Sequence, residues 1–576
     1  MKIALAQINP TVGDLAANAA KISDFARHAL AGGAGIVIFP EMAICGYPAR
    51  DLVEKPDFVA HSQEWLRHAS AAVPGITIIC GCATPAAVST GKSVYNSALV
   101  LRAGELLFQQ SKMLLPTYDV FDELRNFAPA DHQRIWRPDL DDGPRRVALT
   151  ICEDAWNDKN YWPKFQSRLL YARDPVEEQL RSGADFLINI SASPYCTGKI
   201  EQRQEMLGAI AREYRVPVIL VNQVGGNDQL VFDGCSMVVG EDGTLRARAA
   251  CFEEDLLIVD TADWRGAIRS APAGIEAMRK ALVLGVRDYV RKCGFRRVVL
   301  GLSGGVDSAV TAALAVAALG AENVTALYMP TRYSSAESEA DARALAANLG
   351  VELRVVPIEP LFVDALGMLE VAGAADSARA LDLARQNLQS RLRGLALMAH
   401  SNLTGALVLT TGNKSEFAMG YCTLYGDMAG GLSVIADVLK TQVYELAERI
   451  NQNRPVIPET VLRKPPSAEL KPNQFDQDDL PEYAMLDAVI EQYVEKSRTV
   501  EAIAEDLDMD PAAIQALIRR IDYSEYKRQQ AAPGLKISRK AFGMGRRLPI
   551  AQRYEAPLVP GDSLPTVGSG GSGALR

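Results

Sequence analysis

The chain has few of the residues from which metal centres and disulfide frameworks are built. Its 576 residues include five histidines, none at metal-ligand spacing, and nine cysteines without a Cys-x-x-Cys pair. This scarcity argues against a zinc site. Most of the cysteines lie in apolar segments, so we expect them to be small core residues in a reducing compartment, which predicts a cytoplasmic location.

Excess positive charge and long apolar runs are also lacking. The 61 lysine and arginine residues are outnumbered by 70 aspartate and glutamate residues, and the net charge of −9 argues against nucleic acid as a main partner. The longest nearly unbroken apolar run, 309–321, is shorter than the roughly 20 residues that cross a bilayer. The first residues lack the apolar core and cleavage site of a signal peptide. We therefore expect a soluble globular protein of several domains without a membrane partner.

What the chain does have is a regular alternation of apolar strands with helical segments, in two blocks. We interpret residues 1–260 as one α/β unit, 261–274 as a linker, 275–560 as a second α/β unit and 561–576 as a flexible Gly/Ser-rich tail. In the first unit we expect strands at 2–7, 35–39, 76–82, 97–102, 146–151, 185–190, 216–221 and 235–239. In the second unit we expect strands at 298–302, 324–329, 351–358 and 406–410, and helices at 308–319 and 334–349. This spacing is typical of a doubly wound parallel sheet.

The most informative segment of the second unit is Ser303–Ser308, Ser-Gly-Gly-Val-Asp-Ser, between an expected strand and an expected helix. Paired glycines let a backbone approach a phosphate closely, and the following helix start presents free N–H groups to negative charge. The Gly-Lys-Ser/Thr of a Walker A loop is absent. The segment resembles the pyrophosphate-binding loop of the ATP pyrophosphatases, which cleave ATP to AMP and pyrophosphate; an ordinary Gly-rich turn is the alternative. The residues that this resemblance implies for ATP binding are Gly301, Leu302, Ser303, Gly304, Gly305, Val306, Asp307, Ser308 and Thr411.

Three segments of the first unit each place a reactive side chain just beyond a strand. Glu41 follows Ile-Val-Ile-Phe-Pro, Lys112 lies in Gln-Gln-Ser-Lys-Met-Leu-Leu-Pro, and Cys152 follows Val-Ala-Leu-Thr-Ile. Taken singly, such a Glu or Lys is usually solvated and such a Cys usually belongs to the core. Together they resemble the Glu-Lys-Cys triad of the nitrilase (carbon–nitrogen hydrolase) superfamily. That resemblance implies an αββα sandwich for the first unit.

The three side chains have complementary chemistry. A thiol is mostly protonated at neutral pH, so it needs a base or a nearby positive charge to become a nucleophile. Glu41 can take the proton of Cys152, the thiolate can attack a carboxamide carbon, and Lys112 can stabilise the oxyanion. After ammonia leaves, Glu41 can activate the water that hydrolyses the thioester. A carboxylate base in this role requires a pocket that is shielded from water.

The same resemblance implies contacts to a substrate amino acid, glutamine. The residues concerned are Tyr118, Ser193 and Lys199. Glu123 is a further candidate, because it could support the triad through a hydrogen bond, or it could be a surface charge.

An amide hydrolase followed by an ATP-pyrophosphatase unit resembles the glutamine-dependent NAD(+) synthetases. That resemblance implies an enzyme, a ligase that amidates deamido-NAD to NAD with ammonia from glutamine and releases AMP, diphosphate and glutamate. Segments 386–393, 409–416, 420–427 and 526–534 resemble further motifs of that family. They imply deamido-NAD contacts by Asn387, Glu416 and Lys527, and Mg²⁺ ligation by Asp307 and Glu416. The implied small-molecule partners are glutamine, ATP and deamido-NAD, and the implied assembly is a homo-oligomer.

Two alternatives remain open at this point. The acceptor could differ, as in guanylate or asparagine synthesis, although those enzymes resemble a different glutaminase fold in front. The chain could instead be an amidase fused to a nucleotide-binding module without its own catalysis.

Overall fold

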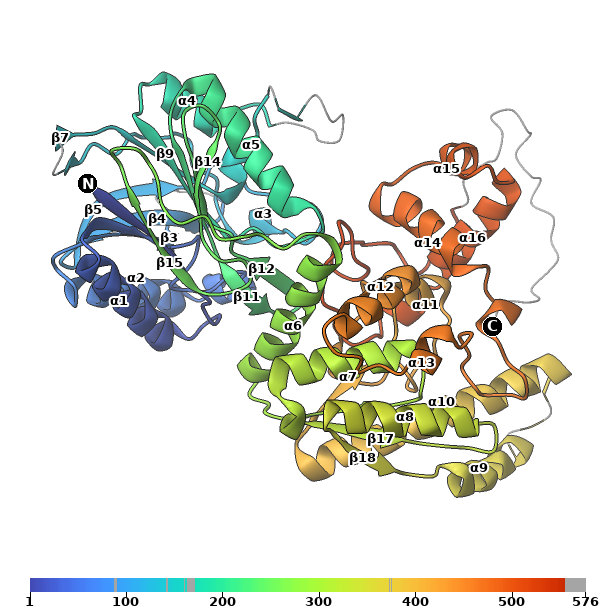
Figure 1. The fold of residues 1–576 in the computed structure, drawn as a ribbon. Helices are drawn as coiled ribbons and strands as arrows, with labels where there is room; N and C mark the ends of the chain where they lie inside the picture. The colour runs from blue at the N-terminus through green and yellow to red at the C-terminus, as the bar shows by residue number, and fades with distance from the viewer. Residues whose placement is uncertain are drawn as a thin grey trace.

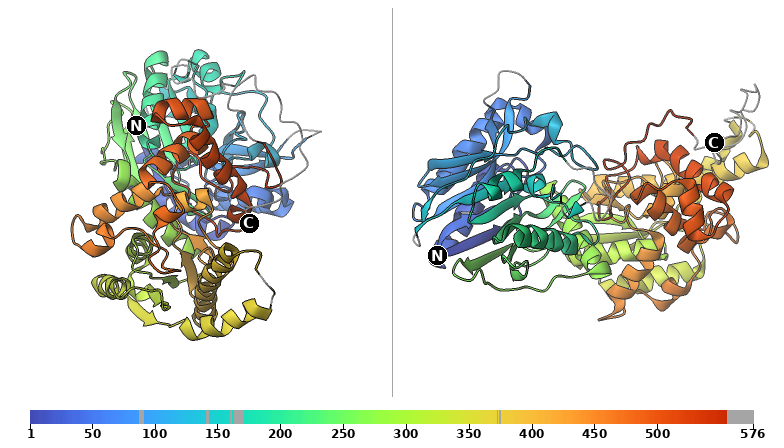
Figure 2. Two further views of the ribbon diagram at one scale, coloured as in Figure 1. Left: turned by 90° about the vertical axis from the view of Figure 1, so that its right-hand side faces the viewer. Right: turned by 90° about the horizontal axis from the view of Figure 1, so that it is seen from above.

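The computed structural model describes residues 1–86, 91–140, 143–159, 161–162, 171–371, 373 and 375–554. Two α/β lobes lie side by side, with helix α6 (Gly274–Lys292) between them (Figures 1 and 2). The expected tail lies outside the described residues, as do the last residues, 555–560, of the expected second unit. Within the described ranges, no helix is both long and apolar enough to cross a membrane.

The first lobe is a sandwich of two sheets with helices on its outer faces, which confirms the predicted αββα fold (Figure 1). Apolar side chains of both sheets, among them Leu5, Val100, Leu149 and Ile219, form the core between them. One sheet has the order β15-β1-β2-β3-β4-β5, and the other has the order β14-β13-β10-β9-β8. The strands of the first are Asp255–Asp260 (β15), Lys2–Gln7 (β1), Ala34–Ile38 (β2), Thr77–Pro85 (β3), Val94–Arg102 (β4) and Glu105–Ser111 (β5). Those of the second are Leu245–Arg248 (β14), Met237–Val239 (β13), Val218–Asn222 (β10), Phe186–Ser191 (β9) and Val147–Ile151 (β8).

Helices cover both faces of this sandwich, and the burial of its strands explains their composition. Helices α1 and α2 contact the first sheet, and α4 and α5 contact the second. Every residue of the parallel strand β8 is buried. Both faces of the strand are covered, and this explains why its sequence is an almost continuous apolar run. The helices are Leu15–Ala31 (α1), Pro56–Ala71 (α2), Pro175–Arg181 (α4) and Lys199–Tyr214 (α5).

The second lobe is built on a five-stranded sheet with the order β18-β17-β16-β19-β20, in which every pair is parallel. Val298 and Leu300 of β16 face a core with α7 and α8, whereas Val299 faces α10 on the other side. The sheet is therefore doubly wound, as predicted, and the strand order reverses at β16, where such sheets bind ligands. The strands are Glu352–Val355 (β18), Val324–Tyr328 (β17), Val298–Gly301 (β16), Leu407–Thr410 (β19) and Leu432–Ser433 (β20). The main helices are Val306–Leu319 (α7), Ala336–Leu349 (α8), Glu359–Val371 (α9), Ala378–Thr404 (α10), Lys414–Met419 (α11) and Lys440–Asn451 (α12).

A helical region completes this lobe. Its helices are Tyr483–Ile490 (α14), Val500–Leu507 (α15), Pro511–Tyr523 (α16) and Glu525–Arg528 (α17). The two lobes then share one apolar core, in which Tyr195 and Val231 of the first lobe pack with Leu282 of α6 and Val310 of α7. Helix α6 rests on the hairpin of β11 (Val224–Asn227) and β12 (Leu230–Asp233).

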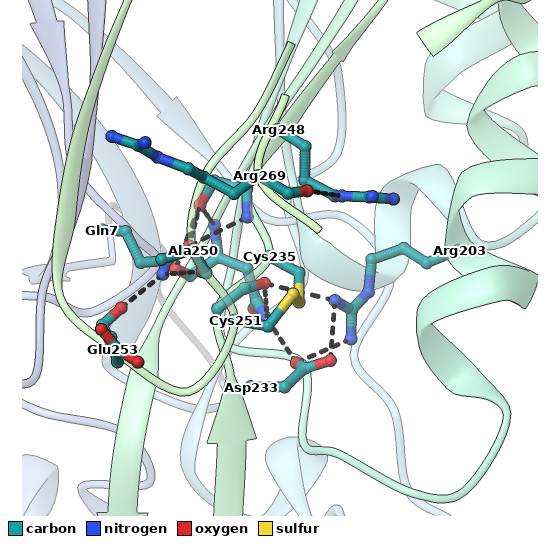
Figure 3. The surroundings of a disulfide bond; sticks show 12 residues. Gln7, Arg203, Asp233, Cys235, Arg248, Ala250, Cys251, Glu253 and Arg269 are labelled. Carbon is teal, nitrogen blue, oxygen red and sulfur yellow. Dashed lines mark hydrogen bonds and ion pairs between the residues drawn. A yellow bond between two sulfur atoms is a disulfide. The ribbon is translucent and has the colours of Figure 1, made fainter. Parts of the chain in front are cut away.

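The cysteines depart from the prediction at one place. Cys235 and Cys251 form a disulfide with a Cα–Cα distance of 4.6 Å, beside the buried Arg203–Asp233 ion pair (Figure 3). The prediction of free core thiols was wrong for this pair. Gly234 forms an isolated antiparallel bridge with Cys251, and this tertiary contact brings together two cysteines 16 residues apart in the sequence. The other seven cysteines are free.

Candidate active sites

Glu41, Lys112 and Cys152 follow strands β2, β5 and β8, and they meet in a buried cluster of the first lobe. The Lys112 Nζ donates a hydrogen bond to Glu41 Oε1 at 2.8 Å. The Asn96 amide also donates to Glu41 Oε1, at 2.7 Å, and the Ala192 N–H donates to Glu41 Oε2 at 2.8 Å. Both carboxylate oxygens are therefore held in place, in a site shielded from water.

Lys112 has a second carboxylate partner, which settles the position of Glu123. Glu123 is buried, and its Oε1 accepts hydrogen bonds from Lys112 at 2.7 Å and from the Tyr47 hydroxyl at 2.8 Å. Burial alone would lower the pKa of Lys112, but Glu123 and Glu41 outweigh it and raise that pKa well above its usual value. Burial raises the pKa of Glu123 to about 7, against the opposing effect of Lys112. Lys112 is thus a permanent cation, suited to stabilise an oxyanion and unsuited to act as a base.

The Cys152 thiol is held in an environment that favours its protonated form. Burial raises its pKa, and the negative charge of Glu41 adds to the effect, while Lys112 opposes it. Cys152 also has a φ of 43°, in the left-handed region that only a sharp turn imposes on a non-glycine residue. This turn leads from β8 into the short helix η2 (Cys152–Ala155). A thiol in this place needs a neighbouring base in order to react.

Asp154 is a residue of this site that the sequence did not reveal. Its carboxylate accepts N–H hydrogen bonds from Met113, Leu114 and Ile151, at 2.9–3.2 Å. It therefore ties the segment after Lys112 to the residue before Cys152. Nothing in the local sequence points to the contacts with Met113 and Leu114, because these two partners lie 41 and 40 residues upstream.

The three residues predicted to contact glutamine lie near the triad, but each is linked to it through another residue. The exposed Tyr118 donates to Glu153, which follows Cys152, at 3.0 Å. The Lys199 ammonium lies 5.2 Å from the ring of Trp156, at the end of the same turn. Ser193 is buried and follows Ala192, whose N–H donates to Glu41. Among the described residues, no hydrogen bond joins Cys152 to Tyr118, Ser193 or Lys199.

In the second lobe, the loop Ser303–Ser308 closes on itself between β16 and α7. The Ser303 and Ser308 hydroxyls lie 3.1 Å apart, and the Gly305 N–H donates to Ser303 Oγ at 3.2 Å. Gly304 has a φ of +82°, and a Cβ there would lie 2.4 Å from the carbonyl oxygen of Ser338. Only glycine meets both conditions, so the paired glycines form a tight turn whose path leaves room for a ligand.

A cavity of about 270 Å³ opens at this loop. All predicted ATP-binding residues except Gly304 line it, and so does Glu416. Asn387 and Lys527 do not. Instead, Asn387 accepts a hydrogen bond from Thr423 at 2.9 Å, and Lys527 donates to the carbonyl oxygens of Gly420 and Cys422 at 2.7 and 2.8 Å. They therefore hold a loop from which Tyr421, Cys422 and Gly426 line the cavity.

The two predicted metal ligands converge on one cation, Lys440. Its Nζ lies 2.5 Å from Asp307 Oδ2 and 3.9 Å from Glu416 Oε1. Asn413 fixes both carboxylates, since its amide donates to Asp307 at 2.8 Å and it caps α11 in a reciprocal pair with Glu416. Burial, with Asp307 nearby, raises the pKa of Glu416 well above its usual value.

These carboxylates could also share a divalent ion. One cation already reaches both, and carboxylate oxygens are the ligands that Mg²⁺ prefers. No cluster of three His, Cys, Asp or Glu side chains suited to a metal occurs among the residues the structure describes. A magnesium ion would therefore need further oxygens from a substrate, which is its usual mode with nucleotides.

Sequence reasoning missed several residues of this cavity, chiefly Lys440, Lys464, Arg393 and Asp476. Lys440 had one usable signal, because it begins helix α12, where a positive charge opposes the helix dipole. Such a lysine is expected to have another partner. Arg393 lies in the segment 386–393 that the resemblance singled out, although no role was assigned to it. Lys464 and Asp476 had no local signal.

Comparison with known proteins gives the same two units. Residues 2–267 match the carbon–nitrogen hydrolase family and residues 278–531 match the NAD synthase family. A glutamine-dependent NAD(+) synthetase of Synechocystis sp. is 45% identical over 566 residues, covering 96% of this chain and 99% of that protein. The one of Thermotoga maritima is 38% identical, covering 97% and 100%. The structure of an Acinetobacter baumannii glutamine-dependent NAD+ synthetase in complex with ADP matches with a TM-score of 0.73 at 36% identity, covering 95% and 98%.

Proposed function

The chain belongs to the glutamine-dependent NAD(+) synthetases, and from that membership we propose how its two buried sites divide the reaction. It is a glutamine-hydrolysing NAD(+) synthase with a carbon–nitrogen hydrolase unit followed by an NAD synthase unit. The observation that carries the proposal is the Lys112–Glu41 hydrogen bond in the site that also holds Cys152. The relatives that match over nearly their full length are glutamine-dependent NAD(+) synthetases. They argue against the two alternatives, a different acceptor of ammonia and a second unit without catalysis.

In the first lobe, Cys152 is the nucleophile toward the glutamine side-chain amide. Glu41 accepts its proton, the thiolate attacks the amide carbon, and Lys112 stabilises the oxyanion. The proton then passes to the leaving ammonia, and Glu41 activates a water molecule that hydrolyses the thioester to glutamate. We assign Tyr118, Ser193 and Lys199 to glutamine binding, since Tyr118 donates to Glu153, Ser193 follows the Ala192 N–H that donates to Glu41, and Lys199 lies over the ring of Trp156 at the end of the Cys152 turn.

In the second lobe, ATP and deamido-NAD react at the cavity beside the loop Ser303–Ser308. We propose that AMP is transferred to the nicotinate carboxylate, which gives that unreactive anion a leaving group, and that diphosphate departs along the loop. Its hydroxyls and N–H groups suit a phosphate. Ammonia then displaces AMP to give NAD. Thr411 contacts ATP, Glu416 contacts deamido-NAD, and Asn387 and Lys527 act through the loop that they hold.

Asp307 and Glu416 fit a magnesium ion, as the approach of Lys440 to both indicates. When bound, magnesium would neutralise charge on the triphosphate. We propose a cytoplasmic homo-oligomer, with the glutaminase unit at 1–260, a linker at 261–274 and the synthetase unit at 275–560. The start of α6 at Gly274 supports the second boundary.

Replacing the nucleophile tests this division. Cys152→Ala should abolish glutamine-driven NAD formation and leave ammonia-driven NAD formation within about twofold of the unchanged protein, because a thiol nucleophile supplies a covalent step that no neighbour can replace. NAD, AMP and glutamate are measured together. Cys82→Ala is the matched control, since Cys82 is a buried cysteine of β3 outside the site. Glutamine-driven turnover by the Cys152 variant would disprove the assignment.

A further inference from the structure

Lys292 is the last residue of α6, the helix that joins the two lobes. Its ammonium group lies within hydrogen-bond distance of four oxygen atoms of the first lobe. The half-buried Nζ donates hydrogen bonds to Asn9 Oδ1 at 2.7 Å, to the Pro10 carbonyl at 2.8 Å, to the Gly226 carbonyl at 2.9 Å and to Asn227 Oδ1 at 2.8 Å. A cation in the last turn of a helix also complements the helix dipole. One side chain of α6 therefore fixes the hairpin of β11 and β12.

Asn227 connects this lysine to the glutaminase site. Its Nδ2 donates to the Tyr47 carbonyl at 3.0 Å, and the Gln223 amide donates to the same oxygen at 3.4 Å. Tyr47 is buried, with its ring edge against Phe232, so its backbone and its hydroxyl move together. The Tyr47 hydroxyl donates to Glu123, which accepts from Lys112.

The orientation of the Glu123 carboxylate depends on this connection, because only one of its two oxygens accepts hydrogen bonds from the described residues. Oε1 accepts from both Tyr47 and Lys112, whereas the buried Oε2 has no hydrogen-bond partner among the described residues. A displacement of Tyr47 would remove one of only two contacts that orient Glu123. Lys112 would then lose its fixed position between Glu123 and Glu41.

We propose that Lys292 is a positioning residue for glutamine hydrolysis, acting through Asn227, Tyr47 and Glu123 on Lys112. The inference rests on the proposed role of Lys112 in the glutaminase. Helix α6 leads within a few residues to β16 and the loop Ser303–Ser308, so it belongs structurally to the synthetase lobe. The glutaminase site is completed by a side chain from the lobe that consumes its ammonia.

Two variants distinguish a role of Lys292 in positioning Lys112 from a role in holding the two lobes together. Asn227→Ala cuts the connection but leaves Lys292 three acceptors, in Asn9, Pro10 and Gly226. Lys292→Met removes both the connection and the docking contacts. We expect each to lower kcat for glutamine-driven NAD formation about tenfold, with ammonia-driven kcat within about twofold and KM for ATP unchanged. Lys21→Met is the control, because Lys21 donates to the Asn9 carbonyl and not to Asn227.

A double-mutant cycle of Lys292 and Tyr47 measures whether the two residues act through the same connection. Tyr47→Phe removes one hydroxyl from the middle of the connection and keeps the ring. If Lys292 acts through Tyr47, the loss in Lys292→Met/Tyr47→Phe is smaller than the product of the two single losses. Multiplicative losses, an unchanged glutamine-driven kcat in Asn227→Ala, or equal losses with glutamine and with ammonia would each overturn the proposal. Failure of the triad assignment is a different result, namely glutamine turnover by Cys152→Ala.

Discussion

Asp154 ties together two catalytic segments without being proposed to touch the substrate. Its carboxylate accepts the N–H groups of Met113 and Leu114 on one side and of Ile151 on the other. An asparagine has one acceptor oxygen and would turn an NH₂ group toward one of these donors. Buried donors left unpaired cost about 1–3 kcal/mol each.

The first prediction concerns the pH dependence of stability that Asp154 confers. Burial raises the pKa of its carboxyl group to about 7. A carboxyl whose pKa is raised on folding stabilises the folded protein at low pH, and that contribution is lost as the pH rises through about 7. The free energy of unfolding of the unchanged protein should therefore fall relative to that of Asp154→Asn between pH 4 and pH 7, by up to about 4 kcal/mol. Urea unfolding of both proteins at pH 4 and pH 8 measures the difference.

The control for this experiment is Asp24→Asn, because Asp24 is an exposed residue of α1 that pairs with the nearby, exposed Arg27. Its difference from the unchanged protein should not vary with pH by more than about 0.5 kcal/mol. A pH-independent difference for Asp154→Asn would show that its carboxyl does not titrate in this range.

The residues of the two sites were not equally predictable. Glu41, Lys112 and Cys152 each follow a strand in a recognisable motif, so the sequence alone singles them out. Asp154 and Lys440 could not be found in this way, because their function lies in contacts to residues far away in the chain. Lys440 reaches Asp307 across 133 residues. Only the tertiary structure places such a pair together.

At the scale of elements, most of the strands that were predicted are buried, although the exposed edge strand β18 was predicted as well. The expected strands 2–7 and 298–302 agree with β1 and β16 to within a residue. Strand β5 was expected ahead of Lys112, but its bounds were not predicted because it is an exposed edge with few buried residues. Strand β11, Val-Gly-Gly-Asn, has little intrinsic strand propensity, and it is stabilised by its hairpin partner and by α6.

The turn between β16 and α7 depends on Gly304. Gly304→Ala should abolish or reduce NAD formation at least about tenfold with either nitrogen donor, because a Cβ 2.4 Å from the Ser338 carbonyl forces the phosphate-binding loop to move. The free energy of unfolding should also fall, by more than the about 1–2 kcal/mol that a left-handed φ alone costs an alanine. Initial rates at varied ATP and thermal unfolding measure both effects.

Gly405→Ala isolates the cost of the backbone conformation. Gly405 has a φ of +69°, and a Cβ there would meet nothing within 4 Å. We expect this variant to lose stability but keep its rates with glutamine and ammonia. Equal effects of the two substitutions would mean that the contact with Ser338 is unimportant.

At the scale of the whole molecule, the two lobes are held by more than α6. The segment after α17 returns to the first lobe, where the Ile537 carbonyl accepts from the Thr197 N–H at 2.9 Å and the Lys536 N–H donates to the Gln229 carbonyl at 2.8 Å. Asp437 of the second lobe accepts from the N–H groups of Ile537 and Ser538. Thr197 and Gln229 of the first lobe and Asp437 of the second lobe are thus joined through a common segment. The sequence showed two units but could not show this joint, which depends on residues more than 300 positions apart.

We predict that ammonia passes directly from the first site to the second and is not released into solvent. In water near neutral pH, ammonia is mostly ammonium, which has no lone pair with which to displace AMP. We predict that amide-labelled [¹⁵N]glutamine, offered with an excess of unlabelled ammonium, gives NAD whose label stays well above the labelled fraction of total ammonia. Mass spectrometry of NAD and of free ammonium measures both. Cys152→Ala is the control, since it can incorporate only the unlabelled nitrogen. Label in NAD equal to that of the solvent pool would mean that ammonia leaves the protein before it reacts, and that the shared core and returning segment serve only to hold the lobes together.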